Sequence, residues 1–83
     1  MTMRVIIADD HPMFRYGLSA VLTQSTAVDV VAAAATGKEL LAAVAEHRPD
    51  VVITDISMPD LDGVVATRQL LAEQPELGVL VLT

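Results

Sequence analysis

Aspartates directly follow two apolar runs of this sequence. Asp9 and Asp10 come after residues 5–8, and Asp55 comes after residues 51–54, a run rich in β-branched side chains. Such runs are typical of buried strands. The carboxyl ends of neighbouring parallel strands share one edge of a sheet, where ligands bind in open α/β folds. If the two strands are neighbours, the three carboxylates lie together at that edge.

Three adjacent carboxylates repel one another, and a cation or bound protons must relieve the repulsion. Mg2+ suits such a site because it takes a few carboxylate oxygens, keeps several waters and shares phosphate oxygens. An aspartate beside Mg2+ can also act as a nucleophile toward phosphorus. The structural alternatives are a cap for Asp55 and a helix N-terminal charge pair for Asp9 and Asp10. His11 is interpreted as a helix-start residue rather than a ligand.

The elements that would position these aspartates alternate between strand and helix. The apolar runs predict strands at residues 5–8, 28–35, 51–54 and 79–82. Helices are predicted over residues 12–24, between Thr36 and Pro49, and from Gly63, capped by Asp62, to the stop at Pro75. The order β-α-β-α-β-α-β implies parallel strands joined by right-handed crossovers, so the predicted fold class is α/β.

Local patterns add detail to these elements. Asp29 interrupts the second strand and indicates an edge position, and Thr36 with Glu39 fits a capping box. Apolar residues at helical spacing predict the inner faces of the three helices. They are Phe14, Leu18, Val21 and Leu22 in the first helix, Leu40, Leu41 and Val44 in the second, and Val64, Thr67, Leu70 and Leu71 in the third.

Composition narrows the classes of partner. The 83 residues suffice for one small domain, and the net charge of −6 argues against nucleic acid or an anionic membrane as a direct partner. That charge favours a cation site or a basic protein partner. The chain has no cysteine, which excludes disulfides and thiolate metal sites. The first apolar run is too short for a signal peptide or a membrane span, so the expected compartment is the cytoplasm.

Two other chemistries do not match the residues. An EF-hand loop drawn around Asp60 and Asp62 would need acidic residues in place of Met58 and Gln69. A phosphatase of the haloacid-dehalogenase type would need a second aspartate in place of Ser57. No Gly-x-Gly-x-x-Gly sequence or Walker loop is present.

The motifs, taken in order, resemble those of a bacterial two-component response-regulator receiver domain. They are DDHP at residues 9–12, DISMP at 55–59 and DG at 62–63. The stretches RYGL at 15–18 and MPDLDG at 58–63 are most similar to the NarL/FixJ group, which carries a LuxR-type helix-turn-helix. The resemblance covers residues 4–83. It implies a parallel sheet of flavodoxin-like, or CheY-like, topology.

The resemblance also implies roles for individual residues. Asp55 matches the phosphoacceptor, which takes a phosphoryl group from a phosphohistidine of a histidine kinase. Asp10 matches the direct Mg2+ ligand, Asp9 acts largely through water, and the main-chain carbonyl of Ser57 matches a third metal contact. Thr83 matches the switch hydroxyl. A receiver promotes its own phosphorylation and dephosphorylation without being a dedicated enzyme.

In the family, the helix that matches residues 12–24 docks the kinase, so Met13, Phe14 and Arg15 are expected to touch that partner. The family continues past the switch threonine with a helix, a fifth strand bearing a lysine, and a final helix. Residues 1–83 are therefore expected to be the N-terminal part of a C-terminally truncated receiver domain, with no DNA-binding domain in the chain.

Two rival hypotheses accompany this interpretation. One is a truncated fragment that no longer signals and acts as an interaction module, forming homo-oligomers through an uncovered edge strand at residues 79–82. The other, ranked behind it, is a phosphohydrolase with an aspartate nucleophile.

Overall fold

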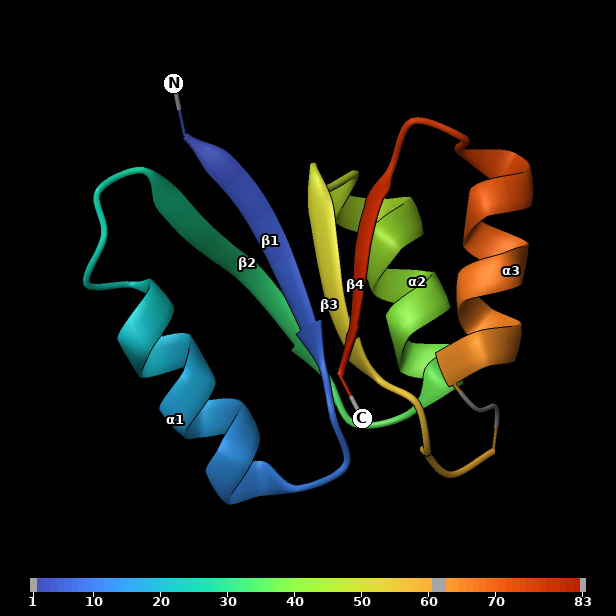
Figure 1. Cartoon of the computed structure of the whole chain (residues 1–83), viewed down its shortest axis with the longest axis horizontal. Coiled ribbons are helices and arrows are strands. Elements are labelled where there is room, and N and C mark those ends of the chain that lie inside the picture. Colours follow the sequence, from blue (N-terminus) through green and yellow to red (C-terminus); the bar gives the residue numbers. More distant parts are fainter. Residues whose placement is uncertain (1, 61–62, 83) are drawn as a thin grey trace.

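The computed structural model describes residues 2–60 and 63–82. Strands and helices alternate along the described chain, in the predicted order (Figure 1). The elements are β1 (Met3–Ala8), α1 (Pro12–Leu22), β2 (Val28–Ala34), α2 (Gly37–His47), β3 (Val51–Asp55), α3 (Gly63–Glu73) and β4 (Gly78–Leu82). No helix in this part of the chain is both long enough and apolar enough to span a membrane.

The four strands form one parallel sheet in the order β2-β1-β3-β4. This is the beginning of the flavodoxin-like order, with the first strand inside the sheet and the second at its edge. The predicted fold class and the edge position of β2 are therefore confirmed. Ala8 pairs with Thr54, so the residues that follow β1 and β3 leave the sheet side by side.

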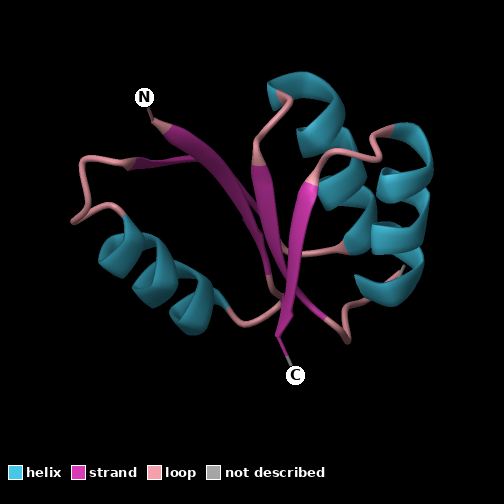
Figure 2. Ribbon diagram, turned by 45° about the horizontal axis from the view of Figure 1, so that its top comes forward, coloured by secondary structure: helices cyan, strands magenta, loops and turns pink. Residues whose placement is uncertain are grey.

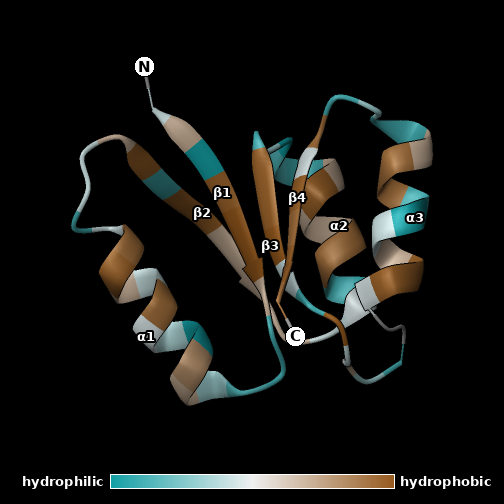
Figure 3. Ribbon diagram, in the orientation of Figure 1, coloured by the Kyte–Doolittle hydropathy of each residue, from teal (hydrophilic) through white to brown (hydrophobic). Residues whose placement is uncertain are grey.

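Helices cover both faces of the sheet. Helix α1 lies on one face, and α2 and α3 lie together on the other (Figures 1 and 2). The main apolar core fills the space between the sheet and the α2–α3 layer, and hydrophobic residues predominate along the central strands that border it (Figure 3). Its buried members are Ile6, Ala8, Ala34, Leu40, Val44, Val52, Met58, Ala66, Leu70 and Leu77.

The start of α2 has the predicted cap. The Thr36 hydroxyl accepts a hydrogen bond from the Glu39 backbone N–H at 3.1 Å. The Glu39 carboxylate reaches back one residue further than in a standard capping box and accepts from the Ala35 N–H at 3.1 Å. At the other end, Arg48 takes a left-handed conformation with φ of 48°, which stops the helix before Pro49.

The predicted inner face of α1 is partly wrong. Phe14 and Val21 are 49% and 62% exposed, and no residue of α1 is fully buried. Leu18 and Leu22 are half-buried, together with Arg15. The helix therefore meets the sheet along the Arg15–Leu18–Leu22 line. Phe14 and Val21 sit on its flank, which no other described element covers.

The predicted inner face of α3 is also partly wrong, because Val64 and Leu71 are 43% and 38% exposed. The buried line instead runs through Gly63, Ala66 and Leu70. Gly63 determines which face of α3 is buried, because a Cβ built there would lie 2.0 Å from the main-chain oxygen of Asp55. Only a glycine lets the first turn of α3 approach the end of β3 this closely, and this contact turns Val64 and Leu71 outward.

The close contact at Gly63 predicts a large effect of a single methyl group. Gly63→Ala should lower the free energy of unfolding by roughly 1–3 kcal/mol, because the Cβ must displace the backbone at Asp55. Gly17→Ala is the matched control, since a Cβ at Gly17 meets nothing within 4 Å. It should raise stability by about 0.5–1 kcal/mol, as expected for an exposed helix position. Urea denaturation measures both, and equal effects would contradict this account of α3.

Candidate functional site

Four side chains gather at the carboxyl edge of the sheet. Asp9, Asp10 and His11 follow β1, and Asp55 ends β3. One ligand atom from each lies within 4.8 Å of the ligand atoms of the other three. The structure thus brings together the three aspartates that the sequence singles out. It adds His11, for which the sequence predicts only a place at the helix start.

Asp9 is the buried anchor of this cluster, with 5% of its surface exposed. Its Oδ1 accepts hydrogen bonds from the His11 backbone N–H at 2.7 Å and from the His11 ring at 2.8 Å. The first of these is an Asx-turn, in which an aspartate bonds the backbone two residues on. Arg15, one turn into α1, donates from Nη1 to the Asp9 carbonyl oxygen at 2.6 Å. These contacts fix the turn that aims Asp9 and Asp10.

Asp10 has a carboxylate oxygen that lacks a hydrogen bond. Its Oδ1 is buried and makes none within the described residues. The His11 Nδ1 lies 3.0 Å away, but this nitrogen carries a single hydrogen, and the Asp9 oxygen is the nearer acceptor. A buried carboxylate oxygen left in this way is costly, and a bound cation would satisfy it. The oxygen-rich donor set therefore fits a hard divalent ion.

Asp55 is half-buried and faces the same space. Its Oδ1 accepts from the Ile56 N–H at 2.7 Å, while its other carboxylate oxygen makes no hydrogen bond with the described residues. The Gly63 N–H donates to the Ile56 carbonyl at 2.9 Å, which holds the loop after β3 against the start of α3. Asp55 therefore has one oxygen fixed and one available to a ligand.

A hollow of about 300 Å3 opens above the cluster. It is lined by Asp9, His11, Phe14, Asp55 and Leu82. Its walls come from the loop after β1 and from α1, β3 and β4. It lies at the edge where α/β folds of this kind bind ligands. The acidic groups thus face a space open to a small anionic group such as a phosphoryl.

The His11 ring responds to this acidic environment. Its pKa is raised above 6.5, first by the hydrogen bond to the Asp9 carboxylate and then by the negative charges of Asp10, Asp9 and Asp55. The ring side chain is 70% exposed. The helix-start assignment is correct for the backbone, because His11 is the N-cap of α1. The sequence signal for the ring contact is the Asp-x-His spacing, which allows an Asx-turn.

Of three other predicted residues, one is described by the structure and two are not. Ser57 is exposed in the loop after β3, and the metal contact of its carbonyl stays a prediction. Thr83, the predicted switch hydroxyl, and Asp62, the predicted cap of α3, lie outside the described residues.

The chain is similar to known proteins along its whole length. Residues 5–83 match the family described as the response regulator receiver domain. The chain is 42% identical, over all 83 residues, to the response regulator protein VraR of Staphylococcus aureus, and it spans 40% of the length of that relative.

Solved structures give the same result. A Salmonella enterica serovar Typhimurium RcsB structure, bound to promoter rprA with the phosphomimetic BeF3-, superposes with a TM-score of 0.91 at 36% identity. That match covers 100% of this chain and 43% of RcsB. A LuxR-family two-component response regulator from Aurantimonas sp. SI85-9A1 superposes with a TM-score of 0.91 at 31% identity, over 98% of this chain and 58% of that chain.

The raised pKa of His11 predicts a pH effect with a defined sign. Because the folded-state pKa exceeds the unfolded value of 6.5, the His11 contacts stabilise the fold fully below that pH. The stabilisation is lost as the pH rises through the folded-state pKa. An NMR titration of metal-free protein should place the His11 pKa above 6.5, and Asp9→Asn should lower it. Asp29→Asn, on the exposed edge of the sheet, should leave it unchanged. A His11 pKa that ignores Asp9→Asn would contradict this origin of the shift.

Proposed function

The chain belongs to the response regulator receiver domain family, with LuxR/NarL-type relatives, and we propose that it accepts a phosphoryl group on Asp55 from a histidine kinase. The observation that carries the proposal is the gathering of the Asp9, Asp10 and Asp55 carboxylates within 4.8 Å at the sheet edge. Such a cluster offers both a cation site and a nucleophile toward phosphorus.

In this proposal Asp10 and Asp55 bind Mg2+ directly, Asp9 acts through water, and the Ser57 carbonyl supplies a further contact. Receiver domains generally bind Mg2+ at an acidic pocket. The buried Asp10 oxygen without a hydrogen bond supports the assignment. The ion would offset negative charge on the phosphoryl oxygens as they approach the carboxylates. The Asx-turn of Asp9 and the Arg15 contact would hold both ligands of β1 in place.

The transfer itself is a substitution at phosphorus. The free carboxylate oxygen of Asp55 forms the new P–O bond, and the P–N bond to the kinase histidine breaks. The electron pair of that bond stays on the leaving imidazole, which then takes a proton. Asp55 must be ionised to attack, and its fixed Oδ1 orients the other oxygen toward the hollow. The proposal also assigns Thr83 as the switch residue, whose hydroxyl would move toward the phosphoryl group.

The exposed face of α1 supports a kinase-docking role. Met13 is 84% exposed and Phe14 is 49% exposed, and Phe14 also borders the hollow above Asp55. A partner seated there would reach the carboxylate directly. Arg15 is half-buried and already donates to Asp9, so it positions the site instead of contacting the kinase. We place this exchange in the cytoplasm, with transcriptional control as its output, by analogy with the promoter-bound RcsB relative.

Phosphorylation of the natural gene product tests this function. With Mg2+ and acetyl phosphate as the donor, intact-mass spectrometry should show one added phosphoryl group, and peptide mapping should place it on Asp55. Asp55→Asn should abolish the addition. Asp29→Asn is the matched control, because it removes an equal charge from an exposed strand position, and it should be phosphorylated like the wild type. Unchanged phosphorylation of Asp55→Asn, or a modification mapped to His11, would refute the assignment.

Strand β4, which is paired on one side only among the described strands, supports a second part of the proposal, self-association of residues 1–83. Among the described strands, β4 pairs with β3 alone, and its Leu80 and Val81 are 53% and 36% exposed. An apolar edge strand of this kind is a template for pairing with another copy. We therefore propose a homo-oligomer built on β4.

Sedimentation velocity of the 83-residue chain over a concentration series tests the β4 contact. The wild-type protein should self-associate, and Leu80→Lys should weaken the association about ten-fold or more, because a charge on the edge opposes pairing. Val64→Lys is the control, since Val64 is similarly exposed at 43% but lies on α3. A wild-type protein that stays monomeric throughout, or equal effects of the two variants, would rule out the β4 interface.

A further inference from the structure

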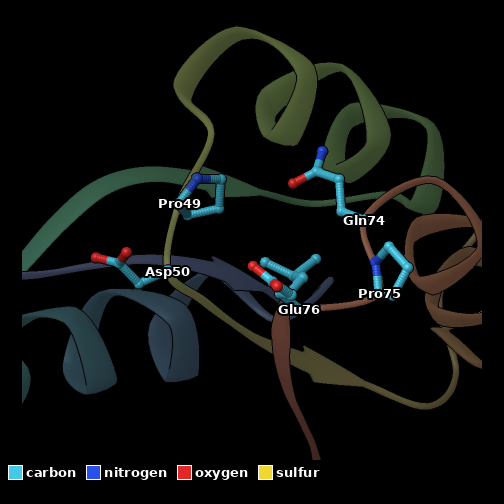
Figure 4. Close-up of a pocket in the computed structure, with 6 residues that line it drawn as sticks. Pro49, Asp50, Gln74, Pro75 and Glu76 are labelled. Carbon is cyan, nitrogen blue, oxygen red and sulfur yellow. The ribbon is translucent and has the colours of Figure 1, made fainter.

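A larger hollow lies at the opposite, amino edge of the sheet, away from the aspartate cluster. It has a volume of about 540 Å3 and sits between the α2–β3 loop and the α3–β4 loop (Figure 4). It is lined by Pro49, Asp50, Gln74, Pro75, Glu76 and Leu77. Neither the phosphoacceptor site nor the β4 edge uses it. Its size falls in the range of about 300–1,000 Å3 that is typical of ligand sites.

Main-chain hydrogen bonds fix the two loops to each other and to β1. The Gly78 N–H donates to the Asp50 carbonyl at 3.1 Å, and the Asp50 N–H donates to the Arg4 carbonyl at 2.8 Å. The Asp50 carboxylate accepts from the Arg4 N–H at 2.8 Å. Proline rings at positions 49 and 75 further restrict the backbone. The hollow is therefore formed before any ligand arrives, which reduces the entropic cost of binding.

Two helices end at this hollow, and the carboxyl end of one of them makes it electrically negative. Helices α2 and α3 both finish at this edge, and a helix carboxyl end bears partial negative charge. The end of α2 is already compensated, because the Arg4 guanidinium donates to the carbonyl oxygens of His47 and Arg48. Helix α3 has no basic residue in its last turn, and Glu73 is its final residue. The end of α3 therefore lacks a cation.

Side chains around the hollow supply acceptors and apolar walls. The Gln74 and Glu76 side chains lie between the two loops (Figure 4), and neither makes a side-chain hydrogen bond or ion pair with the described residues. No lysine or arginine lines the hollow. Pro49 and Leu77 are buried, and they give the hollow an apolar wall beside these acceptors.

We propose that this hollow binds an arginine side chain of a basic peptide segment. A guanidinium is planar and weakly hydrated, so its flat face can lie on the exposed Pro75 ring. Its N–H groups can then reach the Glu76 carboxylate and the Gln74 amide oxygen. The positive charge would compensate the carboxyl end of α3, as Arg4 compensates that of α2. An ammonium group lacks the planar face and the paired donors, so lysine should bind less well.

NMR titration of the natural protein with the blocked tripeptide acetyl-Gly-Arg-Gly-amide tests the proposal, with excess Mg2+ present to occupy the aspartate cluster. Shifts should concentrate at the backbone amides of Asp50, Glu76, Leu77 and Gly78. The same peptide with citrulline, a neutral isostere of arginine, should bind at least about ten-fold more weakly, because it loses the charge-assisted hydrogen bonds. The lysine peptide should fall between the two.

Two variants complete the test. Glu76→Gln should weaken arginine binding about ten-fold, since it removes the charged acceptor. Asp60→Asn is the control, because it removes an exposed carboxylate at the far edge of the sheet, and it should bind the peptide like the wild type. Equal binding of the arginine and citrulline peptides, unchanged binding by Glu76→Gln, or shifts confined to another surface would each overturn the proposal.

Discussion

Repulsion among three carboxylates at one edge of the sheet is the constraint on which this structure depends. Parallel pairing of Ala8 with Thr54 forces the residues that follow β1 and β3 into the same small space. The fold then relieves the repulsion in part. The His11 ring lies between Asp9 and Asp10, and the Ile56 N–H binds one oxygen of Asp55. The negative charge of Asp10 is not fully offset, because its buried carboxylate oxygen has no hydrogen bond with the described residues. A bound cation would offset this charge.

The elements around the cluster keep its geometry through close contacts with two main-chain carbonyls, those of Asp9 and Asp55. Gly63 allows α3 to begin against the carbonyl of Asp55, and Arg15 ties the first turn of α1 to the carbonyl of Asp9. The two loops that carry the carboxylates are thus each fixed to the helix that follows them. A site held in this way needs little rearrangement to receive a ligand, which favours binding.

The sequence predicted the order of elements, the parallel sheet and the meeting of Asp9, Asp10 and Asp55, because buried strands and strand-end polar residues leave strong local patterns. It did not predict which residues of α3 face the core. Val64 and Leu71 fit helical spacing equally well, and only the contact of Gly63 in three dimensions decides which face is buried. The apolar side chain of Phe14 predicts a buried position, yet the residues of α1 that pack against the sheet are Arg15, Leu18 and Leu22. The His11 ring contact depends on an Asx-turn, whose spacing is present in the sequence but common in turns without such a role.

Mg2+ affinity, measured by isothermal titration calorimetry on the natural protein, tests the central claim most directly. If the three carboxylates form one cation site, the wild type binds Mg2+ and both Asp10→Asn and Asp55→Asn weaken binding about ten-fold or more, since each removes a charged ligand. The exposed Asp29→Asn retains wild-type affinity. Wild-type Mg2+ affinity in Asp10→Asn and Asp55→Asn would contradict the account.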